Sequence, residues 1–232
     1  MIKVENFGVW GFEHAIRGMR NPMNSHDKSD SGMGCYRATS NKEFVLCKNC
    51  PFDDRRNCDP FFKTFQIGEK DLDLMKRLYK AGTEHRKYLR QIFVSMDITA
   101  PLYWWKETDQ YRIGVTTNSC STMHTIHKKP FEMDDFSYEH LESIGYNTML
   151  KVIHALNVYR ALYLNTKNKE DWYTMIQLLP SSYNQRRTIT MNYENVVTII
   201  KQRRGHKLDE WNEFVKELEQ LPYVKEIMDE TC

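Results

Sequence analysis

The sequence lacks the long apolar runs and the one-sided charge of a membrane protein or a nucleic-acid-binding protein. No stretch of its 232 residues approaches twenty consecutive apolar side chains, so we expect no transmembrane helix. Lysine and arginine total 33 and aspartate and glutamate total 31, so the net charge of +2 gives no general attraction for nucleic acid or a membrane surface. The N-terminal stretch has no basic-then-apolar signal pattern, and we expect a cytoplasmic protein.

The common short motifs of nucleotide-binding and hydrolase sites are also missing. There is no G-x-x-x-x-G-K-[ST] phosphate loop and no G-x-G-x-x-G turn, so the sequence carries no sign of a P-loop or a classical Rossmann site. Neither H-E-x-x-H nor G-x-S-x-G occurs, which removes the usual signatures of zinc proteases and serine hydrolases. A functional site must therefore be sought in less regular patterns.

The apolar residues that are present are spaced mainly as in helices. At 41% hydrophobic residues the chain can bury a core. Local patterns predict helices over about 69–81, 138–164, 171–179, 193–203 and 208–221. The β-branched run at 91–98 predicts a strand. We expect a mainly helical α+β protein with a modest sheet, folded as a single domain over residues 1–232.

Four of the six cysteines, Cys35, Cys47, Cys50 and Cys58, fall within one 24-residue stretch. Four thiolates suit tetrahedral zinc or an iron–sulfur cluster, and Cys47 and Cys50 have the usual C-x2-C chelate spacing. Free thiols or a local disulfide are the alternatives. The stretch predicts a cysteine-rich insertion at about 31–66, with a metal site as a hypothesis.

Two pairs of arginines flank the helix predicted over 193–203. Arg186 and Arg187 precede it, and Arg203 and Arg204 end it. A guanidinium offers fixed, bidentate donors, so these pairs can hold an anion or the polar edge of a ring. The alternative is a solvated helix end, where cations are favoured by the helix dipole.

The C-terminal motifs resemble the signature of the flavin-dependent thymidylate synthases. The pattern is Leu179-Pro180, then Thr190-Met191-Asn192, then Arg203 eleven residues after the asparagine. The central part of the sequence continues the resemblance, which covers roughly residues 84–215. Its matching residues are Glu84-His85, Ala100-Pro101, Gln110-Tyr111-Arg112, Asn118 and Ser121.

The resemblance implies the α+β fold of that family, with helices around a modest antiparallel sheet, assembled as a homotetramer. It implies reductive methylation of a uracil nucleotide, dUMP or a variant of it, by a thymidylate synthase-type methyltransferase. FAD would be the cofactor, methylenetetrahydrofolate the carbon source and NADPH the reductant, in sites built from several subunits.

The resemblance also assigns roles to individual residues. Arg203 and Ser121 are implied to be catalytic and to bind substrate, with Arg203 at the uracil edge. Arg186 is a further substrate-binding candidate. The residues implied to bind the cofactor are His85, Arg112, Asn118 and Asn192.

The sequence departs from the family pattern at several positions. Gln110, Met123 and Ile176 stand where the family has arginine, Tyr111 stands where it has histidine, and Glu107 stands near an expected glutamine. Several of these family positions serve the nucleotide phosphate, which favours cationic, fork-like donors. The residues available to replace them are His124, His127, Lys128, Lys129, Arg186 and Arg187. The alternative function is that of a non-synthase relative which binds nucleotide or nucleic acid on the same fold.

Overall fold

The computed structural model describes residues 2–35, 45–50 and 64–228. The chain divides into two compact units. Unit 1 comprises residues 1–8, 95–191 and 199–217, and unit 2 comprises residues 9–94, 192–198 and 218–232.

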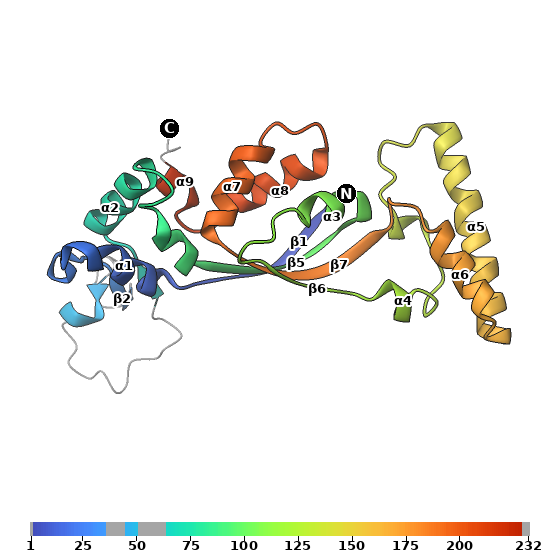
Figure 1. The fold of residues 1–232 in the computed structure, drawn as a ribbon, viewed down its shortest axis with the longest axis horizontal. Helices are drawn as coiled ribbons and strands as arrows, with labels where there is room; N and C mark the ends of the chain where they lie inside the picture. Colours follow the sequence, from blue (N-terminus) through green and yellow to red (C-terminus); the bar gives the residue numbers. More distant parts are fainter. Residues whose placement is uncertain (1, 36–44, 51–63, 229–232) are drawn as a thin grey trace. The chain divides into compact units, whose positions relative to one another are not determined.

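A four-stranded sheet forms the centre of unit 1 (Figure 1). Its strand order is β1 (Lys3–Trp10), β5 (Phe93–Pro101), β7 (Asn184–Asn192) and β6 (Thr116–Ser119). Strand β6 pairs antiparallel with β7, with Thr116 opposite Thr190 and Ser119 opposite Arg187. Along β5, Met96, Ile98 and Ala100 are buried and the residues between them are half-buried. This alternation shows that one face of the sheet packs on a core and the other is more open.

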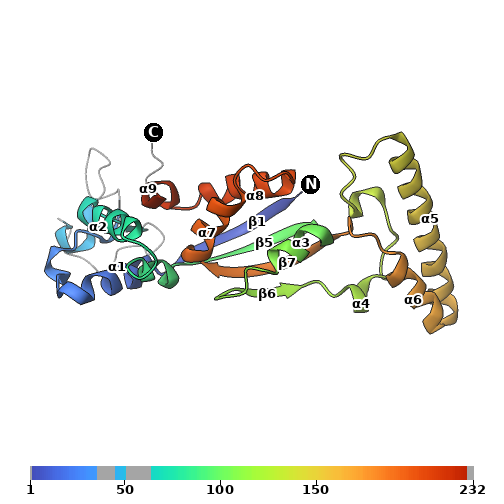
Figure 2. The same cartoon turned by 45° about the horizontal axis from the view of Figure 1, so that its top comes forward.

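Helices α3 (Leu102–Thr108) and α8 (Asp209–Glu219) lie on the packed face of this sheet (Figures 1 and 2). Their core is aromatic: the Trp104 ring centre lies 4.9 Å from that of Trp105, 4.8 Å from that of Trp211 and 5.2 Å from that of Phe214. All four side chains are buried. The adjacent tryptophans of the sequence are therefore core residues of unit 1.

A helical hairpin extends unit 1 beyond the sheet (Figure 1). Helix α5 (Ser143–Thr166) packs against α6 (Lys169–Leu178), with Ile153, Leu156 and Met175 buried between them and the preceding segment. That segment contains the short helices α4 (Thr122–Thr125) and η6 (Met133–Asp135).

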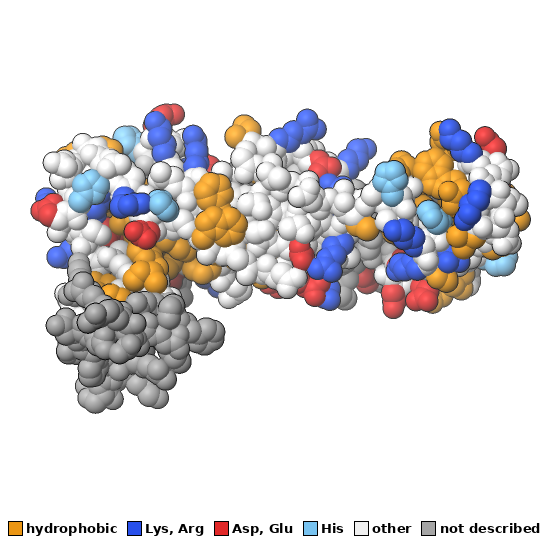
Figure 3. Space-filling model, turned by 90° about the horizontal axis from the view of Figure 1, so that it is seen from below, with side chains coloured by type: hydrophobic (Ala, Val, Ile, Leu, Met, Phe, Trp, Pro, Cys, Tyr) orange, Lys and Arg blue, Asp and Glu red, His pale blue; other side chains and the backbone are white. Residues whose placement is uncertain are grey.

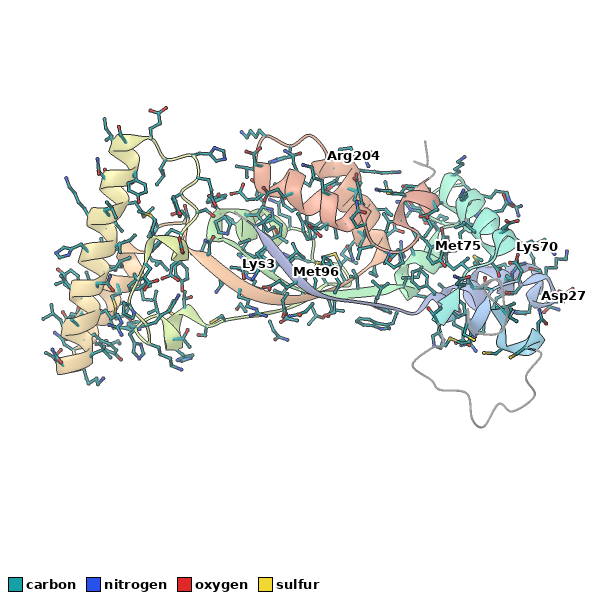
Figure 4. All side chains as sticks on the ribbon, turned by 180° about the vertical axis from the view of Figure 1, so that it is seen from behind. Lys3, Asp27, Lys70, Met75, Met96 and Arg204 are labelled. Carbon is teal, nitrogen blue, oxygen red and sulfur yellow. The ribbon has the colours of Figure 1, made fainter. Side chains whose placement is uncertain are left out.

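Unit 2 is built from short helices and a small antiparallel sheet. Its helices are α1 (Phe12–Arg20), α2 (Glu69–Lys80) and α9 (Val224–Met228), with the 3-10 turns η1 (Asn21–Met23), η2 (His26–Lys28), η3 (Cys47–Asn49) and η5 (Lys87–Gln91) and the first turns of α7 (Tyr193–Arg203). Its sheet has the order β3 (Val45–Leu46), β2 (Gly32–Cys35) and β4 (Thr64–Gln66). Met75 of α2 is fully buried in unit 2, as Met96 of β5 is in unit 1 (Figure 4).

A buried ion pair fixes the loop that precedes β2 to helix α2. Asp71 of α2 accepts from Arg20 Nε at 2.5 Å and from the Ser29 and Ser31 hydroxyls at 2.7 and 2.6 Å. Burial alone would raise the pKa of Asp71, but the hydrogen bonds from Ser31, Ser29 and Arg20 outweigh it and lower this pKa.

The α+β fold class is confirmed. Helices α2, α7 and α8 lie close to their predicted positions, whereas α5 begins at Ser143 rather than near residue 138. Strands β1 and β7 and helix α1 were not predicted. In the part of the chain that the structure describes, no helix is long and apolar enough to cross a membrane. The single-domain organisation stays a prediction, which one cooperative unfolding transition would support.

Candidate functional site

Arg203, predicted to meet the substrate ring, ends helix α7 in a cluster of aromatic and acidic side chains of unit 1. Its Nη1 donates to Glu107 Oε2 at 2.8 Å, and its Nε donates to the Tyr111 hydroxyl at 2.9 Å. Its guanidinium lies 4.4 Å from the centre of the Trp211 ring. Only 15% of the Arg203 side chain is exposed. A carboxylate therefore binds the edge of this guanidinium while an aromatic ring covers its face.

Glu107 and Tyr111 are two of the departures from the family pattern, and both contact Arg203. Trp211 Nε1 also donates to Glu107 Oε2, at 3.0 Å. The Tyr111 hydroxyl donates to Gln202 Oε1 at 2.9 Å. These bonds fix the carboxylate and the phenol beside Arg203. The two residues that depart from the family pattern thus both accept hydrogen bonds from the Arg203 guanidinium.

Arg186 and Arg187 of β7 are also paired with carboxylates. Arg186 Nη2 lies 2.7 Å from Asp97 Oδ2, and Arg187 Nη1 lies 2.9 Å from Asp109 Oδ1. Arg187 also stacks on the buried Trp105, with 4.3 Å between the guanidinium carbon and the ring centre. Adjacent strand residues project to opposite faces, which separates the two guanidinium groups. A carboxylate partner neutralises the charge that each arginine would offer to a phosphate.

Asp97 lies at the centre of a polar row on the open face of the sheet. It accepts from Thr188 Oγ1 at 2.5 Å, from Asn6 Nδ2 at 2.8 Å and from Arg186. These hydrogen bonds, with that from Thr188 the strongest, lower the pKa of Asp97 to about 2. Asn118 of β6 lies directly opposite Thr188 and extends the row. The sheet thereby brings two predicted residues, Asn118 and Arg186, to one face.

Figure 3 views the molecule from below, with the helices α3 and α8 on the far side. The middle of this view is mostly polar uncharged side chains and backbone, with few charged groups. The open face of the sheet is therefore polar but almost neutral. Such a surface suits hydrogen bonding to a neutral ligand better than electrostatic capture of a polyanion.

Ser121 and Arg112 are placed outside the Arg203 cluster. Ser121 is the N-cap of α4, where its Oγ accepts from the His124 backbone N–H at 3.3 Å. Arg112 is exposed, and its Nε donates to the Asp109 backbone carbonyl at 2.8 Å. Within residues 2–35, 45–50 and 64–228, the structure gives Arg112 and Lys128 no carboxylate partner. These two cations remain available to an anion.

Lys129, His127 and His124 were further candidates for a phosphate. The Lys129 side chain pairs with Asp135. The His127 ring packs at 5.1 Å against Tyr163, and its Nδ1 is buried without a hydrogen bond in the described part of the structure. His124 is exposed. Of these three candidates, His124 is the one left beside Arg112 and Lys128 for an anion.

His85 lies in unit 2 and lines its large cavity, whose volume is about 1150 Å³. The cavity is bounded by α1, α2 and residues 84–91. Its basic lining residues are Arg20, Lys28, Lys70, Arg77, His85 and Lys87. Apolar contact surface comes from Met19, Met23, Leu74 and Leu78. The volume is comparable with that of small-molecule and cofactor sites, roughly 300–1,000 Å³.

Asn192 is a buried residue of unit 2 at the N-terminus of α7. Its Oδ1 accepts from the Asn195 backbone N–H at 3.1 Å, which caps the helix. Two residues later, Glu194 pairs at 2.8 Å with Arg86, the residue that follows His85. The structure therefore connects the segments of two predicted cofactor residues, His85 and Asn192.

The predicted metal site finds no support in the described residues. Cys35, Cys47 and Cys50 are free thiols, and Cys58 lies outside the described residues. Residues 2–35, 45–50 and 64–228 contain no group of three or more histidine, cysteine or acidic side chains that could hold a metal ion. The four-cysteine site stays a prediction.

The predicted site residues therefore fall into separate groups. Arg203 lies in the aromatic cluster of unit 1, Arg186 and Asn118 lie on the open sheet face, and His85 and Asn192 lie in unit 2. Sequence reasoning missed the acidic partners Asp97, Asp109 and Glu194, and it treated Glu107 only as a departure. The one signal that was present is that Glu107 and Tyr111 break the motif together.

Comparison with known proteins identifies the fold. No protein-family model matches the sequence, and no curated protein matches it. The crystal structure of the flavin-dependent thymidylate synthase ThyX from Helicobacter pylori, complexed with FAD and dUMP, matches with a TM-score of 0.62 and 17% identity, over 97% of each chain. A second structure of Helicobacter pylori ThyX with FAD and dUMP has the same TM-score and identity and covers 98% of this chain and 97% of that chain.

The chain thus has the fold of these flavin-dependent thymidylate synthases over nearly its whole length. The resemblance seen in the motifs is confirmed at the level of the fold.

Proposed function

We propose that the protein is a flavin-dependent thymidylate synthase-like enzyme that reductively methylates a uracil nucleotide, dUMP or a variant of it. The observation that carries the proposal is the fold, which it shares over 97% of its length with a synthase solved with FAD and dUMP. The cosubstrates in this proposal are methylenetetrahydrofolate and NADPH. The order and spacing of the motifs that end in Asn192 and Arg203 support the same assignment.

The residues of unit 2 fit a flavin. The cavity beside His85 has apolar side chains that suit an aromatic ring system. Its basic residues Arg20, Arg77 and Lys87 are paired with carboxylates, so Lys28 and Lys70 are the lysines proposed to meet the phosphate groups. His85 and Asn192 are the residues of unit 2 proposed to hold the flavin. Arg112 and Asn118, which lie in unit 1, stay cofactor-binding predictions. When bound, the flavin supplies the hydride chemistry, while the protein binds and orients the ring.

The arginines of unit 1 that could bind the nucleotide are paired with carboxylates. Arg203, which is proposed to polarise the substrate ring, shares its guanidinium with Glu107. Arg186 shares its own with Asp97. Each charge-assisted bond to a phosphate contributes about 1.5–3 kcal/mol, so two lost contacts weaken a nucleotide by roughly 3–6 kcal/mol. We therefore propose a substrate without a terminal phosphate, or one whose phosphate meets Arg112 or Lys128.

The same observation favours one alternative, a non-synthase relative that binds a nucleotide on this fold. In that case Glu107 and Tyr111 would convert Arg203 from a substrate ligand into an internal contact. The alternative keeps the flavin-sized cavity but removes the reaction.

A homotetramer is part of the proposal, and helix α5 supports an assembly of copies. Its side chains Ile144, Leu150 and Leu162 are 82%, 45% and 42% exposed. Val158 and Leu164 are exposed as well. Several exposed apolar side chains on one helix are typical of an interface, so a second copy of the chain is the proposed cover.

Flavin loading is the first test. Protein purified without added cofactor and then titrated with FAD should show a visible flavin band that stays with the protein through gel filtration. The matched variants are His85→Ala, which removes a lining side chain, and Glu13→Gln, an exposed change on α1 away from the lining residues. We expect His85→Ala to weaken FAD binding and Glu13→Gln to leave it unchanged. A wild-type protein that takes up no flavin would refute the proposal.

The reaction is tested next, by titration calorimetry with dUMP and deoxyuridine and by a methylation assay. Equal binding of dUMP and deoxyuridine would indicate a substrate without a terminal phosphate. Tighter binding of dUMP that is lost in Arg112→Ala or Lys128→Ala would indicate a phosphate held by one of these cations. Micromolar dUMP binding with formation of dTMP would show an ordinary synthase with a rearranged phosphate site. Flavin binding without any methylation of either compound would favour the non-synthase relative.

A further inference from the structure

An ion pair that the proposed reaction leaves without a role lies in unit 2. Both Nε and Nη2 of Arg86 donate to Glu194 Oε1, at 3.0 and 2.8 Å. The two side chains are only 17% and 16% exposed. Arg86 also lies 5.5 Å from the centre of the Tyr79 ring. The pair is therefore fixed in a largely desolvated setting.

The pair connects two segments that are far apart in the sequence. Arg86 follows His85 in the turn after Gly82, where the backbone N–H groups of both residues donate to the Gly82 carbonyl. Glu194 lies in the first turn of α7, two residues after the cap residue Asn192. Because both ends are held by short local bonds, the ion pair sets where the turn bearing His85 lies against the start of α7.

Stability alone does not account for the pair. Removing two charges from water is expensive, and apolar residues of similar volume often stabilise a protein at least as well. In addition, Glu194 Oε2 is buried and has no hydrogen-bond partner in the described part of the structure. A buried carboxylate oxygen without a partner costs free energy, which offsets part of what the ion pair contributes to stability. The ion pair therefore fixes the positions of Arg86 and Glu194, although both charges lose most of their contact with water.

We propose that Arg86 and Glu194 are positioning residues, which hold His85 and Asn192 in the relative placement that binds the flavin ring. The inference rests on the proposed flavin-binding function and deepens it. It assigns a role to two residues that contact each other and not the ligand. Their ion pair is proposed to determine the relative placement of His85 and Asn192.

The test is a double variant, Arg86→Met with Glu194→Leu, which removes both charges and leaves neither partner unpaired. Because no buried charge is orphaned, we expect it to unfold close to the wild-type temperature. FAD affinity is measured by fluorescence titration, and the visible spectrum of the bound flavin is recorded at saturation. Loss of residues that orient a ligand-binding group weakens metal sites by about 10- to 100-fold, and we expect at least roughly tenfold weaker FAD binding here. The spectrum of the bound flavin should also change shape.

The control is Asp135→Asn, which breaks the Lys129–Asp135 pair of unit 1 and should leave FAD affinity unchanged. Should the double variant not fold, Arg86→Lys replaces it, since it keeps the charge but loses the fork, and the same affinity loss is expected. Wild-type affinity and spectrum in a folded variant would overturn the inference while the flavin proposal stands. Failure of the wild-type protein to bind FAD would overturn both.

Discussion

Helices α5 and α8 belong to the same unit and both are rich in apolar residues, yet they use them differently. In α8 the apolar residues Trp211, Phe214 and Val215 are buried and the intervening positions are polar. In α5 only Ile153 and Leu156 are fully buried, while Ile144 and Leu150 remain exposed. Helix α8 thus buries its apolar side chains within the chain, whereas α5 has further apolar side chains that stay exposed.

The difference shows that an apolar pattern in the sequence does not tell whether the residues are buried within their own chain or exposed on its surface. A helix with one apolar stripe is complete once the stripe meets its own domain. Helix α5 uses one part of its surface for α6 and the segment before it, and other apolar side chains of the helix are exposed. The consequence is that substitutions on the two helices should affect different measurements.

The largest effect on stability is expected from the core of α8. Phe214 is fully buried and packs on Trp104. Replacing Phe214 with alanine should lower the free energy of unfolding by about 3–5 kcal/mol, because it leaves a cavity in an aromatic core. Urea unfolding followed by circular dichroism measures the change. A loss below about 1 kcal/mol would contradict the assignment of α8 as a core helix.

A smaller effect is expected from α2, whose buried face carries a charge. The pKa of Asp71 is lowered in the folded state, so its stabilising contribution is complete above the ordinary carboxyl pKa of about 4 and disappears as the pH falls through the folded-state pKa. Asp71→Asn should cost about 3 kcal/mol at neutral pH, because it leaves the buried Arg20 without its carboxylate partner. The difference between variant and wild type should shrink toward acid pH.

The measurement is urea unfolding of both proteins at a series of pH values from 7 downward. Asp73→Asn is the control, since Asp73 is an exposed neighbour on the same helix that pairs only with Arg77. A pH-independent difference between wild type and Asp71→Asn would show that the charge of Asp71 does not matter.

The smallest effect on stability, but a complete effect on mass, is expected from α5. Ile144→Glu combined with Leu162→Glu places charges on its exposed apolar face. The unfolding free energy of the single chain should change by less than about 0.5 kcal/mol, because neither side chain is buried within it. Light scattering should report a tetramer for the wild type and smaller species for the variant. Equal masses for the two proteins would remove α5 from the interface.

Much of the helical architecture could be predicted from local signals. Helices α2, α7 and α8 follow their predicted ranges because apolar period and end signals agree there. The start of α5 was predicted too early, directly after Ser137, because serine is a common helix N-cap. The Ser137 hydroxyl donates to Asn184 instead, and its backbone N–H donates to the Ser182 carbonyl. Ser137 therefore bonds to residues distant in the sequence and does not cap the helix that follows it.

Strand β7 was missed for a related reason. Its residues, Asn184–Asn192, are mostly polar, and the hydroxyl and arginine side chains conceal the alternation. Only Gln185, Ile189, Met191 and Asn192 of it are buried. A strand whose open face is polar gives a weak signal when its partner strands are unknown.

The sequence could predict the cationic and polar residues of the candidate site, but not which carboxylate pairs with which arginine. The carboxylate partners of Arg186, Arg187 and Arg203 lie 89, 78 and 96 residues away in the chain. Separations of that size are fixed by strand order and helix packing, which single residues do not encode. The family motifs single out Arg203 as a candidate, but they could not show that Glu107 and Tyr111 would contact it.

The packed tryptophans give unit 1 an optical signature of its own. Trp104 lies within 5 Å of both Trp105 and Trp211, centre to centre, in a rigid and asymmetric setting. Unit 2 contains Trp10, which is half exposed. Near-ultraviolet circular dichroism arises from aromatic rings in fixed packing and disappears when that packing loosens. The tryptophan bands of the near-ultraviolet signal will therefore report mainly on the packing of unit 1, without any added label.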